Sequence, residues 1–184
     1  MDPLDDALIM SAVKDGRLEM LAILFERHHV RLFSFFLRLT RDRERSEDLV
    51  QELFVRILKY RHTFRADGSF TAWVYQIARH VHLSQLRRQR PELPLDEVLD
   101  RQPDPTESPS RRLEREEEED LLRRALERLP LRKRELLLLS RQPDLKYKDL
   151  AVLFECSLGA VKVSVHRAVH DLRKAFLEVQ GGSA

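Results

Sequence analysis

The placement of proline and glycine constrains this chain more than any other feature. Five of the eight prolines lie within residues 91–109, whereas residues 17–90 contain no proline and a single glycine, Gly68. Both residue types disfavour helix interiors, so a stretch that lacks them permits long helices on either side of Gly68. We therefore predict an amino-terminal helical domain over residues 1–90, a linker over residues 91–112 and a carboxy-terminal helical domain over residues 113–184.

The spacing of apolar residues predicts helices in both domains. Residues 49–58, 70–81 and 121–129 each repeat apolar side chains with a helical period, which places them in one stripe along a helix. Ser69 precedes the second segment as its expected N-cap. Pro130 follows the third, where it suits the first position of another helix. The sequence shows no strand-like alternation bounded by turns, so we predict an all-α fold.

Net charge changes sign at the same borders. The whole chain carries only +2, but residues 17–90 carry +7 and residues 121–184 carry +6. Residues 1–16 carry −3, and residues 91–120, which include the proline-rich linker, carry −8. Two basic domains joined by an acidic connector fit a protein whose domains each approach nucleic acid.

The sequence gives no support for a membrane or secreted protein. The longest aliphatic run, Leu136–Leu139, is far shorter than the roughly 20 apolar residues that a spanning helix needs. The amino terminus is acidic where a secretory signal would be basic. One cysteine, Cys156, permits no internal disulfide and fits a reducing compartment. We therefore expect a cytoplasmic protein without membrane insertion.

Nothing in the sequence points to catalysis or to a metal. The phosphate-binding loop, the nucleophile elbow and the zinc-protease motif are missing. His166 and His170 have the spacing of a metal-binding pair, but no carboxylates or cysteines complete the ligand shell, which favours a surface or phosphate-facing pair. We predict no enzymatic activity, no catalytic residue, no cofactor and no metal site.

Residues 147–176 have the pattern of a helix-turn-helix. A short helix over residues 147–154 and a turn over residues 155–157 precede a second helix, whose apolar stripe is Val161, Val165, Ala168 and Leu172. The opposite face of this second helix is polar and mostly basic, as in helices that enter the major groove. A helical hairpin with a solvated face is the alternative, but the coincidence of turn and basic face favours DNA binding.

Residues 46–59, SEDLVQELFVRILK, place Asp48 and Glu52 one helical turn apart with Gln51 beside them. Carboxylates in this arrangement suit arginines on a partner helix. The same spacing fits a solvated face or an internal ion pair, so the spacing alone leaves these interpretations open.

Residues 62–90 combine aromatic rings with arginines. Rings that stack on unpaired bases, next to cations that meet phosphate, are what a reader of single-stranded or melted DNA requires. Phe70 and Trp73 lie on the apolar stripe, so for these two residues we expect packing in the core.

Four segments, in this order, carry a resemblance to a known family: SEDLVQELFVRIL, FTAWVYQIARHVHLSQLRR, LERLPLRKRELLLL and YKDLAVLFECSLGAVKVSVHRA. The chain resembles the extracytoplasmic-function sigma factors of bacterial RNA polymerase over about residues 17–176. The resemblance implies a non-enzymatic initiation subunit, with sigma domain two over residues 1–90, a flexible linker over residues 91–112 and sigma domain four over residues 113–184.

The resemblance also implies binding surfaces on both domains. The surface for core RNA polymerase, on the clamp coiled coil of its largest subunit, would comprise Asp48, Leu49, Gln51, Glu52 and Val55. The residues that read and melt the minus-ten element would be Phe64, Arg65, Asp67, Ser69, Tyr75, Arg79, His80, Arg87 and Arg88. Those nearest the minus-35 element would be Ser157, Ala160, Lys162, Ser164, His166 and Arg167. The polymerase flap region is a further expected contact.

Relatives are often held inactive by an anti-sigma factor, so the resemblance implies such a partner besides polymerase and promoter DNA. The sequence departs from the family pattern at His80 and Ser84, where Asn and Asp are usual, and at Val163 and Ser164 in the second helix of the helix-turn-helix. The alternative function is a stand-alone helix-turn-helix regulator, which would bind its DNA tightly and specifically without polymerase.

Overall fold

The computed structural model describes residues 5–88 and 109–181, and these residues contain helices and no strand, which confirms the all-α fold. The amino-terminal half consists of α1 (Asp6–Lys14), α2 (Leu21–Thr40), α3 (Arg43–Tyr60) and α4 (Phe70–Arg88). The carboxy-terminal half consists of α5 (Pro109–Glu127), α6 (Leu131–Ser140), α7 (Tyr147–Leu153) and α8 (Leu158–Gly181). Short 3₁₀ turns occupy Leu18–Met20 and Arg61–Thr63.

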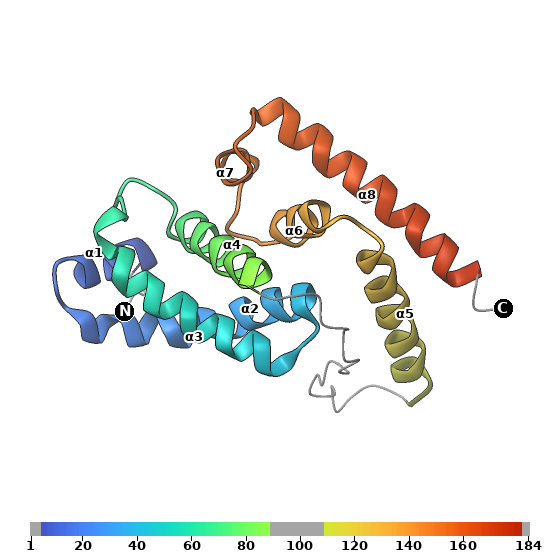
Figure 1. Ribbon diagram of the computed structural model, residues 1–184, viewed down its shortest axis with the longest axis horizontal. Helices are drawn as coiled ribbons and strands as arrows, with labels where there is room; N and C mark the ends of the chain where they lie inside the picture. Colours follow the sequence, from blue (N-terminus) through green and yellow to red (C-terminus); the bar gives the residue numbers. More distant parts are fainter. Residues whose placement is uncertain (1–4, 89–108, 182–184) are drawn as a thin grey trace.

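In the amino-terminal half, α2 and α3 form a tight helical hairpin on which α4 packs (Figure 1). Arg41 ends α2 in the left-handed region, at φ 61°, and Asp42 then caps α3 by accepting a hydrogen bond from the backbone N–H of Arg45 at 2.8 Å. The predicted stripe of α3 is buried, including Leu49, Leu53 and Ile57. Burial of this stripe against α2 and α4 is what stabilises the hairpin.

Ser69 caps α4 as expected, because its hydroxyl oxygen accepts a hydrogen bond from the backbone N–H of Ala72 at 3.1 Å. In α4, Phe70, Val74, Ile77 and Val81 are buried, as the predicted stripe requires.

The carboxy-terminal half contains the predicted helix-turn-helix, in which α7 and α8 are joined by a sharp turn. Glu155 adopts φ 52° in this turn, and the N–H of Cys156 donates to the carbonyl oxygen of Ala151 at 3.0 Å. Val161, Val165 and Ala168 of α8 are buried, as the stripe predicts. In Figure 1, α5 runs beside the carboxy-terminal part of α8, where Ala125 and Leu129 pack near Ala168.

Two details of the predicted boundaries differ in the structure. α5 begins at Pro109, so the end of the predicted linker is helical, while residues 91–108 of that linker lie outside the described residues. Pro130 is the N-cap of α6 rather than its first residue.

The two halves contact each other through α4 and α7 and through α2 and α6. One apolar cluster runs from the amino-terminal half into α6, α7 and the start of α8. This contact decides which face of α4 is open to solvent.

Candidate functional site

A groove on the outer face of α3 and α4 contains all five residues predicted to dock on polymerase. We call it the acidic groove; it has a volume of about 390 Å³ and is lined by Asp48, Leu49, Gln51, Glu52, Val55 and Arg56 of α3 and by Val81, Ser84, Gln85 and Arg88 of α4. Leu49 is buried beneath its floor, whereas Asp48, Gln51, Glu52 and Val55 are exposed. The structure therefore brings the predicted acceptor patch together on one accessible surface.

The two carboxylates of this patch differ in their surroundings. Glu52 Oε1 accepts a hydrogen bond from Arg56 Nε at 2.7 Å, one helical turn along α3. The internal ion pair that the sequence left open is thus present at Glu52. Asp48 lies one turn earlier, is exposed, and faces the same groove as the amide of Gln51. An arginine of a partner could bind Asp48 directly and would compete with Arg56 for Glu52.

A second groove of about 550 Å³ continues from the first, and Arg56 and Ser84 line both. We call it the aromatic groove; its other lining residues are Tyr60, Thr63, Trp73, Gln76, Ile77, His80, Leu83 and Arg87. Two aromatic rings next to arginines and a histidine can stack on unpaired bases and meet phosphate. The indole Nε1 of Trp73 donates to Thr63 Oγ1 at 3.2 Å, which fixes the plane of the ring.

The turn before α4 presents a charged pair to solvent. Arg65 donates to both carboxylate oxygens of Asp67, at 3.1 and 3.0 Å, and both side chains are exposed. The hydrogen bond, and after it the charge of Arg65, lowers the pKa of Asp67 below its ordinary value, and the same contacts raise the pKa of Arg65. Asp67 is therefore a carboxylate acceptor wherever this pair is intact.

The structure divides the predicted minus-ten residues among several environments. His80 and Arg87 line the aromatic groove, Arg88 lines the acidic groove, and Ser69 is the cap of α4. Phe64 is buried, with its ring centre 5.3 Å from that of Trp73. Tyr75 is also buried, edge-on to Phe35 at 5.2 Å. Neither of these two rings is open to a base in this arrangement.

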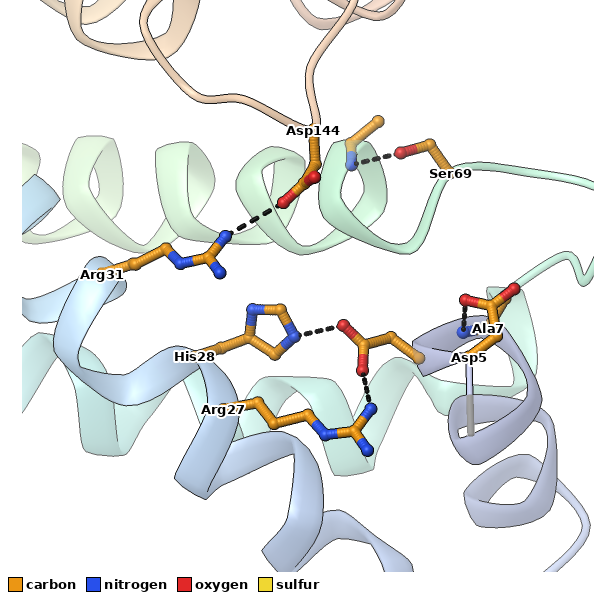
Figure 2. Close-up of polar contacts among 9 residues, drawn as sticks. Asp5, Ala7, Arg27, His28, Arg31, Ser69 and Asp144 are labelled. Atoms are coloured by element: carbon orange, nitrogen blue, oxygen red, sulfur yellow. Dashed lines mark hydrogen bonds and ion pairs between the residues drawn. The ribbon is translucent and has the colours of Figure 1, made fainter. Parts of the chain in front are cut away.

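Arg79 lies on the opposite face of α4 from the grooves, in the contact between the halves. Its Nη2 is 3.2 Å from Glu135 Oε2 of α6, and its guanidinium lies 4.2 Å above the ring of Phe154. His82 Nδ1 is 3.7 Å from the other oxygen of Glu135. Burial raises the pKa of Tyr75, on the same face, to about 12. A second contact between the halves, from Arg31 to Asp144 at 2.9 Å, lies across from the start of α4 (Figure 2).

Part of the aromatic groove was not predicted from the sequence. Trp73 packs against the core, as expected, but it is only half-buried and also lines the groove, together with Tyr60, Gln76 and Arg56. The spacing of Trp73, Gln76, His80 and Arg87 places them on one face of a helix, next to the apolar stripe. That shared face was the signal available in the sequence.

The predicted minus-35 residues share one exposed surface at the start of α8. All of them are exposed in this structure: Ser157, Ala160, Lys162, Ser164, His166 and Arg167. Ser157 caps α8 by accepting a hydrogen bond from the backbone N–H of Ala160 at 3.1 Å. The helix-turn-helix therefore presents two cations, hydroxyls and an imidazole while its apolar stripe faces the core.

Comparison with known proteins decides the family. A family model described as Sigma-70 region 2 matches residues 24–92, and one described as Sigma-70, region 4 matches residues 119–172. The ECF RNA polymerase sigma factor EcfG of Rhodopseudomonas palustris is 33% identical over 155 residues, which are 82% of this chain and 81% of that protein. The chain belongs to the ECF sigma factors. As a sigma factor it binds core RNA polymerase and promoter DNA and directs transcription initiation.

Solved structures share the fold. The structure of CnrH in complex with the cytosolic domain of CnrY is similar to this sigma factor with a TM-score of 0.68 and 22% identity, covering 94% of this chain and 97% of CnrH. The sigma factor RpoE from Bartonella quintana, in a co-crystal with the anti-sigma factor NepR, gives a TM-score of 0.64 and 24% identity, covering 88% and 96%.

Membrane-spanning helices and metal-binding groups are both absent from the described residues. None of the helices over residues 5–88 and 109–181 is long and apolar enough to span a bilayer. In the same ranges, no group of three or more histidine, cysteine, aspartate or glutamate side chains is arranged to hold a metal ion.

Proposed function

We propose that this sigma factor docks on core polymerase through the acidic groove and contacts the unpaired minus-ten strand through the adjoining aromatic groove. The observation that carries the proposal is that the two grooves form one surface, joined at Arg56 and Ser84. A DNA strand bound in the aromatic groove would therefore lie next to the docked polymerase. The exposed face of α8 would contact the minus-35 duplex.

The proposal assigns roles by accessibility. His80 and Arg87 contact the minus-ten strand directly, together with Trp73, which the groove adds to the expected set. Arg65 and Asp67 contact it from the turn before α4. Arg79 can contact the strand only after its ion pair with Glu135 breaks. Phe64 is buried and supports the ring of Trp73 by packing against it. Residues 1–90 then act as domain two, residues 113–184 as domain four and residues 91–112 as their connector.

We infer that this protein acts by binding rather than by catalysis, in the cytoplasm with the polymerase, and that an anti-sigma factor controls it. Support for the last point comes from the Bartonella quintana relative, whose solved structure is a complex with an anti-sigma factor. In this chain, a partner that stabilised the contact between α4 and the carboxy-terminal half would keep Arg79 away from DNA.

The test of the docking surface is a charge reversal with a matched control. Asp48→Arg should abolish binding to core polymerase because it places a cation where a partner arginine would bind, and an exposed substitution leaves the fold intact. Glu47→Arg makes the same change at the neighbouring residue, which lines neither groove, and should preserve core affinity. Fluorescence anisotropy with labelled sigma factor measures both affinities, and wild-type affinity of the Asp48→Arg variant for core polymerase would remove Asp48 from the interface.

The stand-alone regulator is tested by DNA binding with and without polymerase. The sigma factor alone should bind DNA weakly and with strong dependence on salt. Addition of core polymerase should give transcription from specific promoters in vitro. Tight, sequence-specific binding by the isolated chain would favour the stand-alone regulator instead.

A further inference from the structure

The amino-terminal helix α1 lies outside both segments that match the sigma-70 family models, and the proposed function gives it no role. It nevertheless buries Ile9, Met10 and Val13 in the core of the amino-terminal half. Its last residue, Lys14, extends to the segment before α4, where its Nζ donates to the backbone carbonyl oxygen of Phe64 at 2.8 Å. α1 is therefore joined to the recognition loop, residues 64–69, by a charge-assisted hydrogen bond.

The chain conformation after Lys14 fixes the position of this lysine. Gly16 has φ 103°, a conformation that strains other residues, and the N–H of Arg17 donates to the carbonyl oxygen of Ala12 at 3.0 Å. α1 therefore ends at a defined point.

The other end of α1 is tied to the far end of the same loop through α2. Asp6 Oδ1 accepts from Arg27 Nη1 at 2.7 Å, and Asp6 Oδ2 lies 2.6 Å from His28 Nε2. Figure 2 shows the side chains of Arg27 and His28, which extend from α2 in the same direction. The His28 ring packs against Phe70, the residue directly after the loop, at 5.1 Å between ring centres. α1 thus restrains the loop at both ends.

Between these restraints the loop is a short exposed turn. The N–H of Gly68 donates to the carbonyl oxygen of Arg65 at 3.0 Å, and Arg65 and Asp67 form the ion pair described above. A β-carbon on Gly68 would lie only 3.2 Å from that same carbonyl oxygen, so the turn is closed tightly. Because the ends are held, the exposed side chains of the turn have their positions set before any ligand binds, which lowers the entropy cost of binding.

We propose that α1 is a positioning element for the recognition loop and that Lys14 is its principal positioning residue, holding the loop in the conformation that discriminates bases of the minus-ten element. The discrimination rests on the proposed function, since it requires that the loop contact the minus-ten strand. The restraint of the loop by Lys14 is a property of the protein alone.

The restraint is tested without polymerase or DNA. Lys14→Met removes the ammonium donor and keeps an apolar stem of similar length. Loss of one charge-assisted hydrogen bond should speed amide hydrogen exchange in residues 62–70 by about tenfold, and leave exchange in α6 and α8 unchanged. Trp73 is the only tryptophan in the chain and packs on Phe64, so its quenching by acrylamide should rise as well.

Arg17→Met is the matched control, because it removes a cation three residues away that is exposed and is not joined to the loop by any contact described above. It should leave exchange in the loop as in the wild type. Equal exchange in the Lys14→Met variant and the wild type would overturn the restraint. So would a uniform acceleration throughout α1–α4, which would mean that Lys14 acts on global stability alone.

The positioning role is tested with the holoenzyme on promoters that vary at one minus-ten position at a time. Lys14→Met should reduce the preference for the best base over the others by about 3- to 10-fold at one or two positions, with unchanged affinity for core polymerase. A faster-exchanging loop with unchanged base preference would overturn the positioning role. Failure of the proposed docking surface is a separate result, because it would show as retained core affinity in the Asp48→Arg variant.

Discussion

The two faces of α4 have similar residue types and opposite environments. Gln76, His80 and Arg87 line the aromatic groove, whereas Arg79 and His82 face Glu135 of the carboxy-terminal half. Tyr75, on the same side of α4 as Arg79, is buried against Phe35 of α2. Neighbours in the sequence, such as Arg79 and His80, therefore differ in what they can bind. A cation on this helix is available to DNA on one face and is occupied within the protein on the other.

The occupied face is a cluster of buried charge. Glu135 and His82 are almost fully buried, and Arg79 is only 15% exposed at its side chain. Arg79 also donates to the backbone carbonyl oxygen of Leu153 and lies over Phe154. Such a cluster gains little over an apolar contact of the same shape, but removal of Arg79 or of Glu135 leaves the other desolvated and unpaired. The contact between the halves is therefore sensitive to single substitutions.

Glu135→Lys should have the largest effect, because it places a cation against Arg79. Disruption of a buried ion pair costs about 3–5 kcal/mol, which we expect to separate the halves rather than unfold the helices. Small-angle X-ray scattering should show a larger radius of gyration with unchanged helical circular dichroism. Glu118→Lys, the same change at an exposed position of α5, should keep the wild-type radius. An unchanged radius in the Glu135→Lys variant would mean that apolar packing alone holds the halves together.

Tyr75 reports on the same face through its ionisation. Its pKa is raised to about 12, mainly by burial, whereas Tyr60 and Tyr147 are exposed. The folded protein favours the neutral phenol of Tyr75. The contribution of this preference to the stability of the fold is therefore fully present below the ordinary pKa of about 10 and is lost as the pH rises toward 12. Absorbance at the tyrosinate band should therefore show a late titration, near pH 12, from Tyr75.

Two variants assign the late titration. Tyr75→Phe should remove it, and Glu135→Lys should move it toward lower pH by admitting water to this face. A late titration that persists in the Tyr75→Phe variant would belong to another tyrosine. It would contradict the argument that burial raises the pKa of Tyr75.

The sequence predicted the helices well because helical periodicity and caps are local. The stripes of α3 and α8 and the cap at Ser69 depend on residues within one or two turns of each other. The position of Arg79 depends instead on contacts with Glu135 and Phe154, more than fifty positions away. Tyr75 is held against Phe35 of another helix, and no local pattern encodes either contact. A sequence shows which residues share a helix face; it does not show what covers that face.

The two grooves differ in the same way. The acidic patch was predictable because Asp48, Gln51 and Glu52 come from one helix. The aromatic groove combines Tyr60 and Arg56 of α3 with Trp73 and His80 of α4, so it required the packing of two helices. The link from Lys14 to Phe64 joins residues 50 positions apart, and nothing in the sequence near either residue indicates it.

Arg87→Ala tests the open face and should have a smaller effect. If Arg87 meets a phosphate of the unpaired strand, its removal should weaken holoenzyme binding at all promoter sequences. The slope of log K against log salt should fall by about 0.7, the contribution of one single-strand phosphate contact. The control is Arg173→Ala, which changes an exposed residue of α8 outside the aromatic groove. Both variants are measured on DNA that has a minus-ten element and no minus-35 element, where Arg173→Ala should keep the wild-type salt slope. An unchanged salt slope for Arg87→Ala would remove this arginine from the strand path.

The smallest effect should come from the exposed contact between the halves, the ion pair of Arg31 and Asp144. Its side chains are 50% and 56% exposed, so Asp144→Ala should cost at most about 1 kcal/mol, and salt should screen that cost. The charge of Asp144 raises the pKa of Tyr75 and that of Arg31 lowers it, so the substitution should shift the late tyrosine titration to lower pH. Arg31→Ala should shift the titration the opposite way, and a double-mutant cycle on thermal unfolding gives the coupling. A cost in the range expected for Glu135→Lys would mean that the solvent-exposed pair, and not the buried cluster on α4, holds the two halves together.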